Sequence, residues 1–77
     1  MKLTIKYFGL LAEITKCNEE QIEFSGNLID DLLDTIFLKY PNLKGKDFEV
    51  AQNQILATKQ SEILATEIAL LPPFAGG

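Results

Sequence analysis

The chain ends in Pro72-Pro73-Phe74-Ala75-Gly76-Gly77, a segment whose residue types suit a reactive chain end. Gly76 and Gly77 have no Cβ, so they form a slim and permissive peptide that can enter a narrow channel in another protein. A free α-carboxylate on Gly77 is ionised at neutral pH. We therefore expect Gly77, with Gly76 beside it, to carry the chemistry of this protein.

The residues around the two glycines suit a segment that is presented to a partner. Pro72 and Pro73 restrict φ and favour an extended polyproline course, which holds the segment away from the rest of the fold. Apolar side chains near this segment are candidate anchors for a partner. We expect the partner-binding residues to be Phe8, Leu71, Pro72, Pro73, Phe74 and Ala75.

Composition excludes several classes of function. The chain has 77 residues, and a domain of this size buries only about 60% of the surface of its unfolded chain, so a partner would add stability. Seven lysines against 11 acidic residues give a net charge of −4, which argues against nucleic-acid binding. The absence of histidine and the single cysteine exclude Cys–His and Ser–His pairs and the usual zinc ligand sets. We expect no metal site, no stably bound cofactor and no independent catalytic activity.

The same sequence predicts a cytoplasmic protein that does not associate with membranes. One cysteine, Cys17, fits a reducing compartment, and we expect it to be an inert small residue. No apolar run approaches the roughly 20 residues that span a bilayer. Asp30, Asp31 and Asp34 are interpreted as a solvated helix face, not as paired catalytic carboxylates.

Hydrophobic periodicity predicts one main helix and five strands. The helix covers residues 28–40, with Asn27 as its N-cap, Leu38 on its exposed face and Pro41 at its end. A short helical turn is expected over 10–15, a turn at Asn53-Gln54, and Ile63 and Leu64 are expected to pack beneath a loop. The predicted strands cover residues 2–8, 19–24, 47–52, 55–57 and 67–71.

This order of elements predicts an α+β fold that resembles the β-grasp of ubiquitin-like proteins. A mixed sheet of four to five strands would be covered by the main helix at about 28–40, with the last strand parallel to the first in the sheet centre. Residues 1–71 would form the domain, and residues 72–77 a flexible, extended Gly-Gly tail.

The segment from Glu67 to Gly77 resembles the C-terminal signature of the molybdopterin synthase small subunits, the MoaD family of sulfur-carrier proteins. That signature consists of an acidic residue, an apolar strand, Pro-Pro, two variable residues and Gly-Gly. The Asn53-Gln54 pair and the aromatic pair Tyr7-Phe8 at the end of the first strand are also similar to the family.

The resemblance implies a function for Gly77. A ubiquitin-activating-type adenylyltransferase would use ATP to adenylate the carboxylate, and a persulfide sulfur donor would convert it into a thiocarboxylate. The tail would then enter the large subunit of molybdopterin synthase and donate sulfur to cyclic pyranopterin monophosphate during molybdenum cofactor biosynthesis. The large subunit would supply the catalytic groups, in a heterotetramer of two small and two large subunits.

Three other functions remain open at this point. The nearest alternative is a sulfur carrier for another pathway, such as thiamin thiazole synthesis, but those carriers are usually shorter and lack Pro-Pro, so the sequence favours the molybdopterin function. The chain would also suit a protein modifier that joins lysines through Gly77. A β-grasp interaction module with passive glycines is the third alternative.

Overall fold

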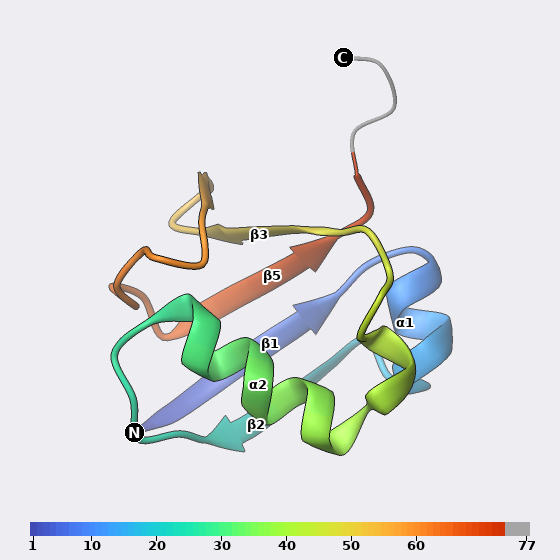
Figure 1. The fold of residues 1–77 in the computed structure, drawn as a ribbon, viewed down its shortest axis with the longest axis horizontal. Coiled ribbons are helices and arrows are strands. Elements are labelled where there is room, and N and C mark those ends of the chain that lie inside the picture. Colours follow the sequence, from blue (N-terminus) through green and yellow to red (C-terminus); the bar gives the residue numbers. More distant parts are fainter. Residues whose placement is uncertain (74–77) are drawn as a thin grey trace.

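The computed structural model describes residues 1–73, which form one sheet with its helices packed on one side (Figure 1). The predicted residues Phe74, Ala75, Gly76 and Gly77 lie outside the described part of the chain. The elements are β1 (Lys2–Tyr7), α1 (Leu10–Thr15), β2 (Glu19–Glu23), α2 (Ile29–Lys39), the 3₁₀ turn η1 (Pro41–Leu43), β3 (Glu49–Gln52), β4 (Ile55–Ala57) and β5 (Glu67–Leu71).

The five strands pair in the order β2-β1-β5-β3-β4. β1 and β5 are parallel and adjacent in the middle of the sheet, while every other pair is antiparallel. This arrangement confirms the predicted β-grasp topology. β1 and β5 are the first and last of these strands, so their pairing joins the β1–β2 hairpin to the β3–β4 hairpin in one sheet.

The helix α2 covers one face of the sheet because its apolar residues recur at helical spacing. Ile29, Leu32, Leu33 and Ile36 are all buried, whereas Leu38 on the opposite side is 86% exposed, as its position predicted. The core side chains of the sheet that meet this helix come mainly from the two central strands. They are Leu3, Ile5, Tyr7, Ile68 and Leu70.

The predicted N-cap at Asn27 is wrong. The capping position is Leu28, and no side chain caps the helix. The amide N–H groups of Ile29 and Asp30 instead donate to the carbonyl oxygens of Ser61 and Lys59, at 2.9 and 3.0 Å. A distant loop therefore satisfies two of the backbone donors that the first turn leaves without a partner inside the helix.

The buried side chain of Gln52 holds the loop that precedes β5. Its Nε2 donates to the carbonyl oxygen of Glu62 at 2.7 Å, and its Oε1 accepts from the N–H of Leu64 at 2.8 Å. Ile63 packs against the core, as predicted, but Leu64 is 74% exposed, so its predicted packing is wrong. The bonds to Gln52 fix the loop with Ile63 turned inward and Leu64 outward.

The β3–β4 turn confirms the prediction at Asn53-Gln54, and both residues have a positive φ, 53° and 64°. Two consecutive residues with positive φ are typical of a type I′ hairpin turn, which favours Asn-Gly. Gln54→Gly should therefore stabilise the fold by about 1 kcal/mol, because a left-handed conformation costs an L-residue about that much. Urea denaturation measures this change.

The matched control is Gln60→Gly, the same substitution at an exposed turn residue whose φ is not positive. That variant should lose roughly 0.5 kcal/mol, because glycine only adds entropy to the unfolded chain there. Equal destabilisation of the two variants would contradict the assigned turn.

A hydrogen-bonded cluster around Glu20 ties β1, β2 and the end of α2 together. The carboxylate of Glu20 accepts from the hydroxyls of Tyr7 and Tyr40, at 2.7 and 2.6 Å, and from the ammonium of Lys39. The rings of Tyr7 and Tyr40 also meet edge to face, with centroids 5.9 Å apart. Nothing in the sequence pattern indicated this cluster, since its members come from separate elements.

The cluster shifts the pKa values of its members. Burial alone would raise the pKa of Glu20, but the hydrogen bonds from Lys39, Tyr40 and Tyr7 favour the carboxylate and hold its pKa below the ordinary value. Burial, followed by the contact with Glu20, raises the pKa of Tyr7, so this hydroxyl stays protonated and donates.

The lowered pKa of Glu20 makes the stability of the fold depend on pH. The contribution of the Glu20 carboxylate to the free energy of unfolding is fully present above the pKa that Glu20 has in the unfolded chain. It is lost as the pH falls through the lower pKa of the folded protein. Glu20→Gln should cost about 1–2 kcal/mol at neutral pH, where charged hydrogen bonds are lost. Urea denaturation of wild type and Glu20→Gln measures the free energy of unfolding at neutral pH and at a pH below the ordinary carboxyl pKa. The difference in free energy between the two proteins should be smaller in acid.

The exposed neighbour Glu19 provides the control, because no hydrogen bond or ion pair of its side chain occurs within residues 1–73. Glu19→Gln should change the free energy of unfolding by less than about 0.5 kcal/mol. If the difference in the free energy of unfolding between wild type and Glu20→Gln stays constant with pH, the charge of Glu20 has no role in stability.

Candidate functional site

The structure brings together four of the predicted partner-binding residues: Phe8, Leu71, Pro72 and Pro73. The N–H of Phe8 donates to the carbonyl oxygen of Leu70 at 3.1 Å, which continues the parallel pairing beyond Tyr7 and Leu70. Phe8 therefore lies opposite Leu71 in register. Both residues follow a core residue in their strands, so both side chains face away from α2.

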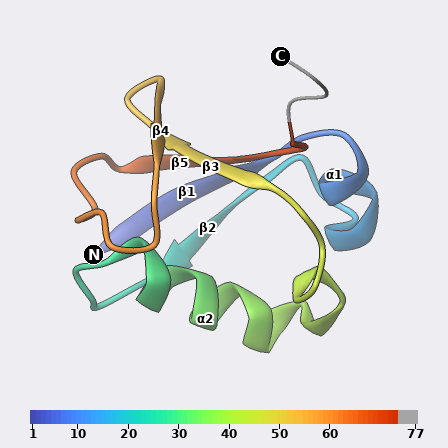
Figure 2. The ribbon, with the colours of Figure 1, turned by 45° about the horizontal axis from the view of Figure 1, so that its top comes forward.

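The face of the sheet that carries Phe8 and Leu71 has no helix on it within residues 1–73, whereas α2 covers the other face (Figure 2). We call it the open face. Register places Ala51 between Ala69 and Leu56 on this face, in the row next to Leu71. The apolar end of the open face consists of Phe8, Ala51, Leu56, Ala69 and Leu71.

The apolar end is accessible in residues 1–73. Phe8 is 44% exposed and Leu56 is 52% exposed, while Ala51, Ala69 and Leu71 are partly exposed. An aromatic and two leucine side chains with small alanines between them form a shallow apolar surface beside the point where β5 ends. Such a surface suits a protein partner that binds close to the tail.

The rest of the open face is polar and mostly charged. Lys6 and Glu67 form an ion pair of 3.4 Å, and in register Lys6 also faces Glu19 while Lys2 faces Glu23. Exposed pairs of this kind contribute little to stability, but they keep this part of the face polar. In register, Glu49 lies opposite Leu71 and Lys6 lies opposite Ala69, so charged side chains also border the apolar end.

The sequence pattern predicted Phe8 and Leu71 but missed Ala51, Leu56 and Ala69. The alternation within β3, β4 and β5 was the available signal, since residues two apart share a face. It did not identify these residues as one surface, because that requires the strand order and register.

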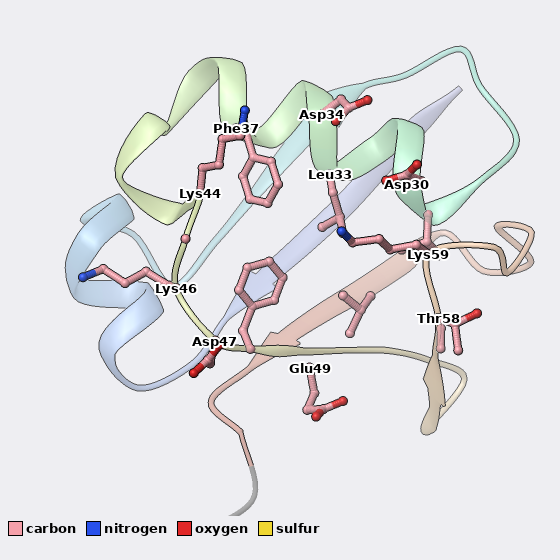
Figure 3. A pocket seen from close by; sticks show the side chains of 15 residues that line it. Asp30, Leu33, Asp34, Phe37, Lys44, Lys46, Asp47, Glu49, Thr58 and Lys59 are labelled. Carbon is pink, nitrogen blue, oxygen red and sulfur yellow. The ribbon is translucent and has the colours of Figure 1, made fainter.

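A cavity of about 470 Å³ lies on the other side of the sheet, between α2 and the segment leading into β3 (Figure 3). Leu33, Phe37 and Phe48 contribute apolar surface, and the two phenylalanine rings meet edge to face at 6.1 Å. The charged lining mixes both signs: Asp30, Asp34, Asp47, Glu49, Lys44, Lys46 and Lys59. This lining has no histidine or cysteine and no uniform charge for a charged ligand.

Groups for covalent or metal chemistry are not assembled in the described residues. Within residues 1–73, no three His, Cys, Asp or Glu side chains come together as a metal site. Cys17 is half-buried, with its Sγ 3.7 Å from Oγ1 of Thr15 and 4.0 Å from Oη of Tyr40. Nor does any helix in this part of the chain have the length and apolar character needed to cross a membrane.

Solved structures similar to this chain share its fold. A putative molybdopterin converting factor subunit 1 from Pyrococcus furiosus is 22% identical, with a TM-score of 0.87 over 96% of this chain and 99% of that chain. SAMP1 from Haloferax volcanii is 24% identical, with a TM-score of 0.81 over the full length of both chains.

A third similar structure is a complex of subunits 1 and 2 of the molybdopterin-converting factor from Helicobacter pylori 26695. It is 26% identical to this chain, with a TM-score of 0.64 and complete coverage of both chains. Residues 5–77, nearly the whole sequence, match the ThiS family. The chain therefore belongs to the ThiS family, whose ubiquitin-like sulfur-carrier fold it shares.

Proposed function

We propose that this chain is the sulfur-carrying small subunit of a molybdopterin synthase. The observation that carries the proposal is the position of the apolar end of the open face, directly beside the strand that leads into Pro72-Pro73 and the Gly-Gly sequence. A partner that binds Phe8 and Leu71 is placed where it can receive the tail. The Helicobacter pylori complex supports a second subunit as that partner.

The proposed chemistry requires only the carboxylate of Gly77 from this chain. The carboxylate attacks the α-phosphorus of ATP on an activating enzyme, which releases pyrophosphate and leaves an acyl-adenylate. A persulfide sulfur then attacks the carbonyl carbon and displaces AMP, and a thiol cleaves the resulting acyl disulfide to leave the thiocarboxylate. ATP is a substrate of the activating enzyme, and this chain does not retain it.

Sulfur transfer then occurs in the large subunit. The nucleophilic thiocarboxylate sulfur forms a bond to a side-chain carbon of cyclic pyranopterin monophosphate while the carbon–oxygen bond at that carbon breaks. Water then hydrolyses the acyl–sulfur bond, which leaves the sulfur on the pterin and returns the Gly77 carboxylate, and a second carrier supplies the second sulfur. The general acid–base groups belong to the large subunit. Ala75 has a small side chain and Gly76 has none, which keeps the cross-section of the tail low.

A second candidate function is protein modification, and the similarity to SAMP1 of Haloferax volcanii, a small archaeal modifier protein, favours it. The same acyl-adenylate would then react with a lysine amine and form an isopeptide bond at Gly77. A thiamin thiazole sulfur carrier would share the thiocarboxylate and differ only in its acceptor.

Intact-mass spectrometry tests the shared step. The chain is incubated with a co-expressed activating enzyme, ATP and a persulfide source, and wild type should gain the mass of one sulfur in exchange for one oxygen at Gly77. The chain lacking Gly77 is the control and should not react. An unmodified wild-type mass with an enzyme that is active on its own carrier would refute sulfur carriage.

The acceptor is distinguished in a second assay with the purified thiocarboxylate. Molybdopterin should form when the large synthase subunit and cyclic pyranopterin monophosphate are added. Isopeptide adducts on lysines in a cell extract, without molybdopterin formation, would favour the modifier function instead.

The apolar end should determine binding to the large subunit. Phe8→Ser removes its aromatic anchor and should weaken binding at least tenfold, since central aromatic residues often contribute about 2 kcal/mol or more. Isothermal titration calorimetry with the large subunit measures the dissociation constant. Urea denaturation of the variant shows whether the fold is retained.

Leu38→Ser is the matched control, because Leu38 is 86% exposed on the far side of α2. This change should leave the dissociation constant within about twofold of wild type, since surface changes away from an interface are nearly neutral. Equal affinity of Phe8→Ser and wild type would exclude the open face as the binding surface.

A further inference from the structure

The central strands separate at Gly9 and Pro72. The parallel register of Tyr7 with Leu70 continues through Phe8 and Leu71, so the next pair is Gly9 with Pro72. Pro72 has no N–H, which ends the hydrogen-bond ladder on that side. Gly9 turns away from the sheet and begins α1, and its carbonyl accepts from the N–H of Ala12 at 3.1 Å.

Gly9 has a backbone conformation that other residues rarely adopt. Its φ is 58° and its ψ is −134°, outside the regions open to residues with a Cβ. This conformation lets β1 turn sharply into α1, while β5 continues into the proline pair (Figure 1). The turn alone therefore requires glycine.

The ring of Pro72 makes a second, separate demand for glycine. A Cβ on Gly9 would lie 2.8 Å from Cγ of Pro72 and 3.8 Å from its Cδ. The distance of 2.8 Å is shorter than van der Waals contact between two carbon atoms, so the proline ring occupies the space that a Cβ at position 9 would need. The end of the first strand and the base of the tail are in contact only because position 9 has no side chain.

We propose that this contact sets the direction in which the chain leaves the sheet at Pro72-Pro73, and that Gly9 is a positioning residue for the tail. The inference rests on the proposed sulfur-carrier function. The proline ring fixes φ of Pro72 but leaves the neighbouring ψ angles free, and the seat on Gly9 restrains them. A tail held in one direction enters a partner's channel with less entropy to lose.

A double-mutant cycle tests the contact. Gly9→Ala places a methyl group against the ring, and Pro72→Ala removes the Cγ and Cδ atoms that it would meet. The readout is kcat/KM for thiocarboxylate formation by the activating enzyme. Each single variant should fall about tenfold, because misplacing a reacting group by about an ångström has effects of this size or larger.

The double variant separates positioning from backbone strain. Strain from the positive φ of Gly9 is present in both backgrounds, whereas the collision with the ring exists only when Pro72 is intact. Gly9→Ala should therefore cause less than a twofold further loss in the Pro72→Ala background. An undiminished tenfold loss there would overturn the proposal and leave Gly9 a purely structural glycine.

A second measurement does not depend on sulfur chemistry. Residual dipolar couplings of the Cα–Hα bonds of Pro72 and Pro73, measured on the isolated wild-type chain, should fit the same alignment tensor as the sheet. The coupling of residue 73 should shrink by about half or more in Pro72→Ala, in which Gly9 and its turn are unchanged. A coupling of the same size in both proteins would overturn the proposal.

The double-mutant cycle and the dipolar couplings also separate the sulfur-carrier function from the positioning role of Gly9. If wild type forms no thiocarboxylate, the sulfur-carrier function fails, and the dipolar couplings alone decide the role of Gly9. If wild type reacts but the cycle is additive, the sulfur-carrier function stands and the positioning role of Gly9 is wrong.

Discussion

The parallel pairing of β1 with β5 is the constraint on which the other features depend. It joins the two ends of the described chain, and it buries Ile5, Tyr7, Ile68 and Leu70 beneath α2. Parallel strands have their carboxyl ends at the same edge of a sheet. Phe8 and Leu71 therefore meet at that edge, and the segment that follows β5 begins beside an apolar surface.

Much of the fold follows from periodicity in the sequence. The alternation of Leu3, Ile5 and Tyr7 and the helical spacing of Ile29, Leu32, Leu33 and Ile36 predicted the elements that form the core. The topology was predictable because a hairpin, one crossing helix and a final apolar strand have few compact arrangements.

The features that the sequence did not reveal depend on contacts between distant segments. The N-terminal turn of α2 uses carbonyls of Lys59 and Ser61 in place of a cap at Asn27, and Glu20 is held by residues of β1 and α2. Leu64 is exposed because Gln52 forms hydrogen bonds with the backbone of Leu64 and of Glu62. Each of these outcomes depends on packing that a local pattern does not encode.

The candidate site was predictable in a similar way. Phe8 and Leu71 were predicted as apolar anchors for a partner, and the structure brings them together, whereas Ala51, Leu56 and Ala69 join them only through the register of β3, β4 and β5. Gly9 was not among the predicted site residues. Its contact with Pro72 requires both the parallel register and the turn into α1. Phe74 to Gly77 lie outside the described residues, so their predicted roles rest on residue type.

The central position of β5 also has a mechanical consequence. A pull on Pro73 is transmitted along β5, which is hydrogen-bonded to β1 on one side and to β3 on the other. Hydrogen bonds between strands run across the strand axis, so this force loads both ladders in shear, and many bonds share it at once. An edge strand pulled from its end would instead be held by one ladder. The fold is thus built to withstand traction along its last strand, as withdrawal of a tightly held peptide from a partner would require.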